Sequence, residues 1–213
     1  MYQFPSSTKV EQNFRLTELL KMIKADKVLK ADAQNILGVQ MTNAISEQTT
    51  GLHSSEEVNE IYVLKIMLNS EKVPNEFIKA LDKTIRFQVL FEIHFDNKVK
   101  FLTEPKTIKE DKLSILRLFE SEWAIYYPPE EMPLVGSLAE LYKSILTKLN
   151  GYGFRAGEGI ATWIQRIQEI EKTEKEFAKI EKLANTESQP KKKFEYNAKL
   201  REIYEKMKRL KEV

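Results

Sequence analysis

The stretch NEIYVLKIMLNSEKVPNEFIKALDKTIRFQVLFEIHFDNKVKFL, residues 59–102, decides the fold class. It opens with the apolar, β-branched run Ile61–Leu68, which predicts a strand buried on both faces. Pro74 stands where a helix over 75–81 begins, because proline lacks only an N–H that has no partner in a first helical turn. A second apolar run, Phe87–Phe95, predicts another strand.

The chain is then expected to turn back on itself. Asp96 and Asn97 are turn residues, and residues 98–102 alternate polar and apolar side chains as a half-exposed returning strand does. A fourth strand is predicted over 114–119, running on into 123–127. The first two strands are joined by about 18 residues, enough for a crossover helix, so they can be parallel neighbours or separated by another strand. These features predict an α+β fold with a small, mostly antiparallel sheet of about four strands and helices on one face.

The flanking segments of this body are predicted with less regular patterns. Residues 14–24 have helical periodicity, and residues 27–37 suit a second helix. For residues 39–45, periodicity does not decide between strand and helix. Ser137 is expected to cap a helix, with Glu140 completing a capping box.

The pattern of apolar and charged residues changes after a glycine-rich segment, residues 151–159, which we interpret as a hinge. Apolar residues from Ile160 to Leu210 then recur at spacings of three and four, interrupted at 185–190, with charged residues between them. This pattern predicts an antiparallel helical hairpin of coiled-coil type. We therefore divide the chain into a body, residues 1–150, and a tail, residues 151–213.

The composition limits the classes of protein that remain. A net charge of +2 does not by itself indicate a nucleic-acid partner, and the absence of cysteine excludes disulfides and thiolate chemistry. No apolar run reaches the length of a membrane span, and the N-terminus lacks the pattern of an export signal. We expect a cytoplasmic protein with no membrane contact, no cofactor and no metal.

Together these residues resemble the bacterial family called domain of unknown function 4391. The resemblance rests on the segments around Phe4–Thr8, Val58–Val63, Ile85–Phe91 and Lys192–Arg201, and it covers nearly the whole chain. It implies proximity to DNA methyltransferases and helicases of defence systems, and hence a complex-forming or nucleic-acid-linked role. It implies no catalytic residues. Residues 26–52 depart from the family, because its aromatic-basic helix is absent.

Asp96, Glu104 and Lys106 come closest to a catalytic set. Two acids and a lysine on adjacent strands can hold Mg²⁺ beside a proton-transferring amine, as metal-dependent nucleases do. However, Asp96 lies in a predicted turn and Pro105 interrupts the strand, so an ordinary turn and strand end is the preferred interpretation.

The two histidines and an aromatic loop are further candidates. His94 and Glu92 lie two residues apart on one strand face, which suits proton exchange or metal binding, but no third ligand is evident, and we favour a hydrogen-bonded strand histidine. For His53 the sequence indicates no neighbouring ligand or proton-exchange partner. Residues 126–129, Tyr-Tyr-Pro-Pro, suit a recognition surface or, as we prefer, a segment packed on the sheet.

The tail carries the chain's only charge asymmetry, because residues 171–213 hold 13 basic and 9 acidic residues. Lys191, Lys192 and Lys193 open the last helix, where positive charge opposes the helix dipole. These lysines and Arg201 are the candidate contacts to an acidic partner or to nucleic acid. Solvated Glu–Lys pairs on a helix flank are the simpler explanation.

Three hypotheses about function follow. The first is a non-enzymatic accessory protein of a DNA-modification or phage-defence complex, whose tail binds a protein partner, such as a helicase or methyltransferase subunit, or a second copy of itself. The second is direct nucleic-acid binding by the basic helix. The third is a divergent Mg²⁺-dependent nuclease, which requires Asp96, Glu104 and Lys106 to converge.

Overall fold

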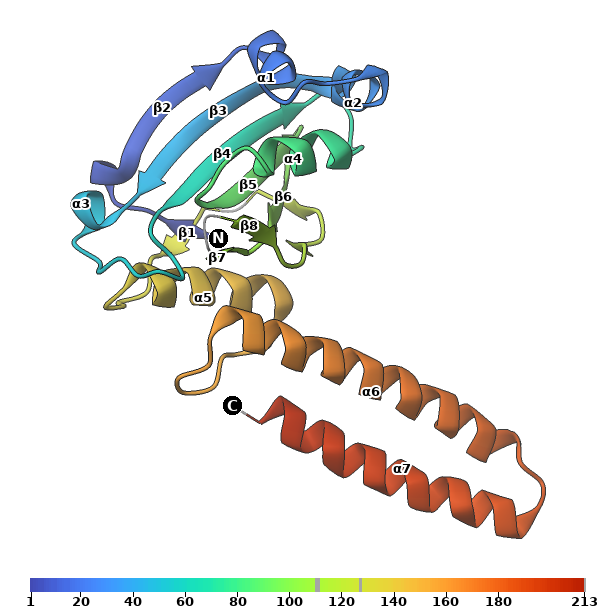
Figure 1. Ribbon diagram of the computed structural model, residues 1–213. Helices are drawn as coiled ribbons and strands as arrows, with labels where there is room; N and C mark the ends of the chain where they lie inside the picture. The colour runs from blue at the N-terminus through green and yellow to red at the C-terminus, as the bar shows by residue number, and fades with distance from the viewer. Residues whose placement is uncertain (110–111, 127, 213) are drawn as a thin grey trace. The chain divides into compact units, whose positions relative to one another are not determined.

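The structure, a computed structural model, describes residues 1–109, 112–126 and 128–212. The chain divides into two compact units, Met1–Gly151 and Tyr152–Val213. The first is an α+β unit and the second is a pair of helices (Figure 1). Each is described separately below.

The first unit is built on a mixed, seven-stranded sheet (Figure 1). Its path runs β10-β6-β5-β4-β3-β2, and β9 pairs with β6 beside that path. β4 and β5 are parallel, whereas the other neighbours are antiparallel. The predicted sheet of about four mostly antiparallel strands was therefore too small. The strands are β2 (Lys9–Phe14), β3 (Ile36–Ile45), β4 (Ile61–Leu68), β5 (Gln88–Phe95), β6 (Lys98–Thr103), β9 (Phe119–Glu120) and β10 (Ala124–Ile125).

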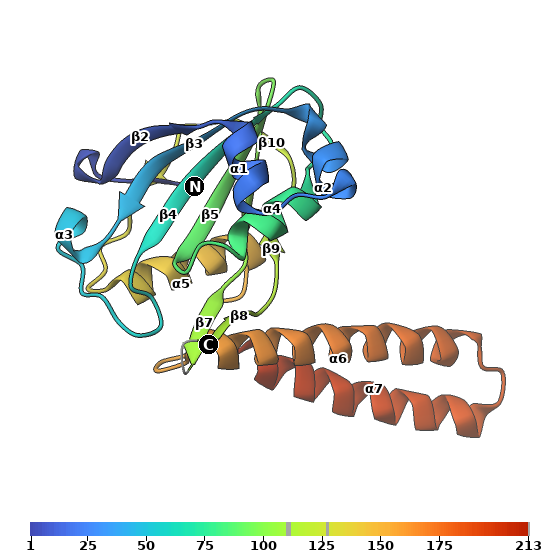
Figure 2. The same ribbon diagram turned by 45° about the horizontal axis from the view of Figure 1, so that its top comes forward.

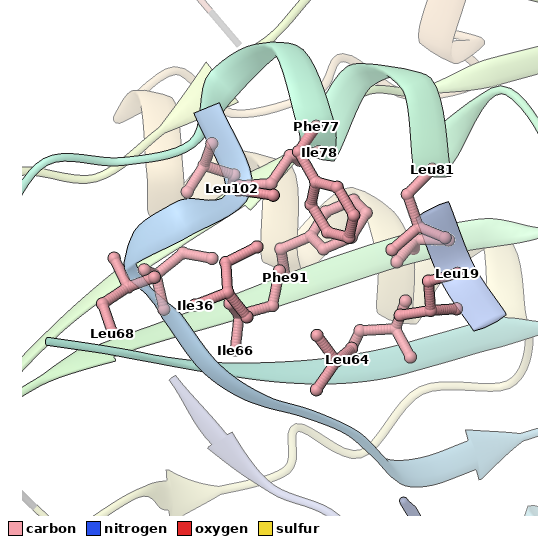
Figure 3. Packing of buried hydrophobic residues seen from close by; sticks show 14 residues of the cluster. Leu19, Ile36, Leu64, Ile66, Leu68, Phe77, Ile78, Leu81, Phe91 and Leu102 are labelled. Atoms are coloured by element: carbon pink, nitrogen blue, oxygen red, sulfur yellow. The ribbon is translucent and has the colours of Figure 1, made fainter. Parts of the chain in front are cut away.

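The predicted strand–helix–strand unit forms, with α4 (Asn75–Asp82) as the crossover between the parallel strands β4 and β5. Its apolar residues cover one sheet face, here called the α4 face. Figure 3 shows Phe77 and Leu81 of α4 directed toward Leu64 and Phe91 of the strands. Burial of these side chains stabilises each by roughly 1.5–3 kcal/mol. α1 (Leu16–Met22) adds its buried Leu19 to the same core.

The opposite sheet face is partly covered by α5 (Leu138–Asn150). Oη of the buried Tyr142 lies 2.7 Å from Oγ1 of Thr103 on β6. Thr103 points away from the α4 face, because its neighbour Leu102 is part of the core beneath α4. Helices therefore lie on both faces, and the expectation of helices on one face was wrong. Figure 2 shows the sheet between α4 and α5 from a second angle.

The N-terminal third combines short helices with a long strand. The helix expected over 27–37 is shorter in the structure. It forms as α2 (Lys27–Asp32) and a 3-10 turn, Ala33–Asn35, and β3 begins at Ile36. Residues 39–45 are thus strand. A short helix, α3 (Glu47–Thr50), follows.

The strand expected over 114–119 is divided between two pairings. β7 (Lys106–Lys109) and β8 (Lys112–Ile115) form a separate hairpin, while Phe119 pairs with Thr103 in the main sheet. At the N-terminus, β1 (Tyr2–Gln3) pairs in parallel with β11 (Glu130–Glu131). A 3-10 turn, Ser6–Thr8, leads into β2.

The second unit consists of α6 (Ile160–Thr186) and α7 (Pro190–Lys211), which pack side by side as the predicted hairpin (Figure 1). Most of the predicted apolar positions on α6 are buried, and on α7 Ile203 is buried. Trp163 is fully buried, and its ring stacks on that of Phe154 with centroids 4.4 Å apart. Within the described ranges, no helix has the length and apolar character needed to cross a membrane.

Candidate functional site

The proposed catalytic set does not come together. Asp96 lies in the turn between β5 and β6, in a left-handed conformation with φ of 51°. Glu104 and Lys106 follow the other end of β6. At the usual rise per residue, the six residues of β6 separate the two ends by about 20 Å, so Asp96 cannot share a cation with the other two.

Lys106 instead forms a buried ion pair with Asp82, the last residue of α4. Lys106 Nζ lies 2.7 Å from Asp82 Oδ1, and it also donates to the carbonyl oxygens of Ile85 and Phe87. The side chains of Lys106 and Asp82 are 1% and 0% exposed. The amide of Gln88 brackets the backbone of Lys106 with hydrogen bonds to its N–H and carbonyl. This lysine therefore anchors the helix end to the sheet.

Burial perturbs the titration of both partners. It raises the pKa of Asp82 to about 6, and the charge of Lys106 only partly opposes this rise. Burial likewise lowers the pKa of Lys106. Apart from that ammonium, no group in the described ranges donates to the Asp82 carboxylate. A pair with perturbed pKa values in a cleft indicates a catalytic site. This pair is instead buried, and its ammonium already binds the Asp82 carboxylate and two carbonyl oxygens.

His94 and Glu92 of β5 form the expected pair. His94 Nε2 lies 2.6 Å from Glu92 Oε1, and both side chains are mostly buried. The ring of Tyr126 lies 5.7 Å from that of His94. Tyr126, Pro128 and Pro129 are exposed, and Tyr127 lies outside the described residues. No cluster of three or more metal-binding side chains was found in the ranges that the structure describes.

His53 lies elsewhere, in an isolated β-bridge with Ser137 at the start of α5. Its ring is largely exposed, and its Nδ1 lies 3.7 Å from a carboxylate oxygen of Glu47. The Ser137 hydroxyl caps α5 as expected by accepting from the Glu140 N–H, while the Glu140 side chain reaches the N–H of Gly136.

Ion pairs join the two helices of the hairpin along part of their length. Lys199 Nζ lies 3.1 Å from Glu176 Oε1, and Lys211 Nζ lies 2.6 Å from Glu174 Oε1. Lys206 also pairs with Glu169. These lysines of α7 are therefore neutralised by α6. They behave as the solvated Glu–Lys flank that the sequence suggested for the whole basic helix.

Lys191, Lys192, Lys193 and Arg201 differ from these lysines. All four are exposed, and none forms an ion pair with a residue that the structure describes. Three of them occupy the first turn of α7, where the helix dipole already carries positive charge. The hairpin therefore presents four cations that form no ion pair within the described part of the chain.

Aromatic side chains are exposed beside these cations. Phe194 is 75% exposed and Tyr204 is 53% exposed. A shallow groove of about 490 Å³ lies along the two helices and includes Arg201 and Tyr204. Its other lining residues are Phe177, Leu200 and Glu205. The surface of Lys191, Lys192, Lys193, Phe194, Arg201 and Tyr204 is called the α7 patch below.

The base of the hairpin is fixed by a buried arginine. Arg166 of α6 forms a bidentate pair with Glu158, at 2.8 and 2.7 Å, and donates to the carbonyl oxygens of Gly153 and Leu210. Burial opposes ionisation of Glu158, but hydrogen bonds from Arg166 and from the Arg155 N–H outweigh it and lower the pKa of Glu158. Arg155 in turn donates to the carbonyl oxygens of Arg209 and Glu212. The free carbonyls that end α7 are thus capped by two arginines.

Sequence reasoning missed Asp82 and Arg166, because each resembles an ordinary charged residue on an amphipathic helix. The only available signal for Arg166 was its position among apolar neighbours, Trp163, Ile167 and Ile170, on the buried side of α6. For Asp82 the corresponding signal was its place one residue after the buried Leu81 at a helix end. Neither signal identifies the partner.

Neither curated proteins nor solved structures gave a match to this chain. One family does match, under the description Domain of unknown function (DUF4391), over residues 3–207 of the 213. The match spans both structural units, from β1 into the last turns of α7. The chain therefore belongs to the DUF4391 family.

Proposed function

We propose that this protein is a non-enzymatic interaction protein whose α7 patch binds an acidic surface of a partner protein. The observation that carries the proposal is the contrast within α7. Lys199, Lys206 and Lys211 are paired with glutamates of α6, whereas the lysines of the first turn have no carboxylate partner among the described residues. A protein partner with carboxylates would supply the missing charge.

The exposed aromatic residues add apolar contact surface for a protein partner. Phe194 exposes most of its surface next to the lysine triplet, and aromatic residues are enriched at protein interfaces. The gene neighbourhood implied by the family resemblance makes a methyltransferase or helicase subunit of a defence complex the first partner to test.

The test compares two charge reversals in the full chain. The first variant, K191E/K192E/K193E, reverses the triplet. The matched control, K24E/K27E/K30E, reverses three exposed lysines of the first unit and has the same net charge. Both are purified from the native host together with bound proteins, and the affinity of each co-purifying protein is then measured with purified components. We expect the first variant and F194A to weaken binding at least tenfold, with the control unchanged.

Equal binding by the triplet variant and the control would refute the α7 patch as the interface. Deletion of residues 186–213 is a poorer test, because it also uncovers the buried positions of α6 such as Ile180. Sedimentation of the purified protein tests self-association, which would make a second copy the partner.

Nucleic-acid binding is the second candidate function, because the same four cations can contact phosphates. Each phosphate contact would make the affinity more sensitive to salt. Fluorescence anisotropy with a duplex and a single-stranded oligonucleotide, between 50 and 300 mM salt, separates the two functions. Tight binding with a steep salt dependence that K191E/K192E/K193E abolishes would favour nucleic acid over a protein partner.

A further inference from the structure

The sheet face opposite α4 carries polar residues where α5 does not cover it. The strand register places Gln40, Lys65, Glu92 and Phe101 side by side across β3, β4, β5 and β6. Register neighbours point to the same face of a sheet, so these four side chains form one row. The sequence predicted a β4 buried on both faces, but Lys65 in its centre is only half buried.

A cleft of about 510 Å³ lies over this face. That volume is within the range of small-molecule sites, which is about 300–1,000 Å³. The cleft is bordered by the N-terminal segment with β1 and by residues 124–126 and 128–130. Its lining is mixed, with aromatic rings, two lysines and two carboxylates.

The charged side chains of the cleft differ in whether they have partners. Both carboxylates that line it are engaged, since Glu92 pairs with His94 and Glu130 pairs with Lys148. The lining lysines, Lys9 and Lys65, form no ion pair with any part of the chain that the structure describes. Lys9 and Lys65 are therefore the side-chain cations of the lining that remain for an anionic ligand.

The two lysines can reach one anion. Lys9 is in register with Asn43, which is in register with Val63, two residues before Lys65. Lys9 and Lys65 are therefore two strands apart and offset by two residues, a backbone separation of roughly 12 Å. Two extended lysine side chains span such a separation and converge on one phosphate-sized group.

Aromatic side chains line the rest of the cleft. The ring of Tyr126 is half exposed, and Phe101 stands next to Glu92 in the polar row. Tyr2 and Phe4 line the N-terminal side. Aromatic rings of this kind stack on planar ligands such as nucleobases.

We propose that this cleft binds a mononucleotide, with its phosphate on Lys65 and Lys9 and its base against the aromatic rings. The proposal concerns the first unit alone and does not depend on the α7 patch. A mononucleotide would use both properties of the lining, the unpaired cations and the stacking surfaces. A simple anion would use only the cations, and an apolar molecule only the rings.

The chain contains two histidines, and they provide a built-in readout. His94 lies beside the cleft, in contact with Glu92 and near Tyr126, whereas His53 is exposed near the start of α5 and does not line the cleft. Proton NMR of the full chain, titrated with AMP, GMP, CMP and UMP, is expected to shift the ring signals of His94 with at least one nucleotide. The signals of His53 should stay in place.

Calorimetry of the full chain then separates the parts of the ligand. We expect the best mononucleotide to bind at least ten times more tightly than inorganic phosphate or the matching nucleoside. K65M and Y126A should each weaken binding about tenfold, K65R should retain most of the affinity, and the exposed control K30M should behave as the wild type.

Three results would overturn the proposal. One is no binding of any of the four nucleotides at millimolar concentration. The second is phosphate alone binding as tightly as the nucleotide, which would reduce the cleft to an anion site. The third is unchanged affinity in both K65M and Y126A, which would place the ligand elsewhere.

Discussion

Lys106 and Asp82 form an ion pair that is closed to solvent, with Nζ and Oδ1 2.7 Å apart. The lysine is the first residue of β7, three residues after β6 ends, and the aspartate ends α4, so the pair ties the crossover helix to the segment that follows β6. The ammonium also binds two carbonyl oxygens of the loop between α4 and β5. Among the described residues the carboxylate has no other donor, so the stability of the protein should depend on pH through this pair.

The contribution of Asp82 to stability is expected to fall as pH rises through about 6. In the folded protein its pKa is raised from 3.8 to about 6, so between these values the folded state binds more protons than the unfolded state. Stability from this group is therefore complete below pH 4 and is lost toward pH 7. Urea unfolding of wild type and D82N at several pH values isolates the effect. The difference, wild type minus D82N, should decrease by about 1 kcal/mol from pH 5 to pH 7. A constant or rising difference would contradict the assignment.

Removing only the lysine should be costly, because it leaves a buried carboxylate and two carbonyl oxygens without their donor. K106M is expected to lower the free energy of unfolding by about 3 kcal/mol at pH 7. The double variant D82N/K106M should recover part of this loss, because no unpaired charge then remains inside. Urea unfolding of both variants measures the coupling. If the double variant were less stable than the sum of the single effects, the two residues would not act as a pair.

The sequence predicted the centre of the fold well, because the information there is local. The run Ile61–Leu68 forms β4 with the expected bounds, and the helix after Pro74 forms as α4. The apolar run that ends at Phe119 was misread, since it is shared between a hairpin and the main sheet. Its partners lie at residues 103, 106 and 107, and periodicity along one segment carries no information about a distant partner.

The candidate sites show the same division. Lys106 was singled out from the sequence, but with Asp96, which lies at the wrong end of β6. The actual partner, Asp82, is 24 positions earlier in the chain, at a helix end that looks exposed. Lys65 was hidden in an apolar run, and only the register of β4 with β5 shows that it lies next to Glu92. The lysine triplet was visible directly, because clustered charge is a local property.

The buried arginine at the base of the hairpin should hold the last turns of α7 in place. Arg166 donates four hydrogen bonds, and lysine cannot reproduce its fork, so R166K is expected to cost about 2 kcal/mol locally. Hydrogen exchange of peptides covering residues 200–212 should then quicken about thirtyfold, at tenfold for each 1.4 kcal/mol. The matched control is R201K, because Arg201 is exposed and forms no ion pair within the described chain. Equal exchange in the two variants would show that Arg166 does not anchor α7.

Removing the hydroxyl group of Thr103 should lower the free energy of unfolding more than removing that of Tyr142. Thr103 Oγ1 lies 2.6 Å from the carbonyl oxygen of Val89 and donates to it, so Tyr142 Oη must donate to Thr103. Y142F leaves Thr103 with its own acceptor and should cost about 1 kcal/mol. T103V leaves the buried tyrosine hydroxyl without its acceptor and removes the bond from Thr103 to the Val89 carbonyl, so we expect a loss of about 2–3 kcal/mol. Urea unfolding at neutral pH measures both variants, since burial raises the pKa of Tyr142 and keeps it protonated there. If Y142F proved the more damaging substitution, the direction of donation between the two hydroxyls would have to be reversed.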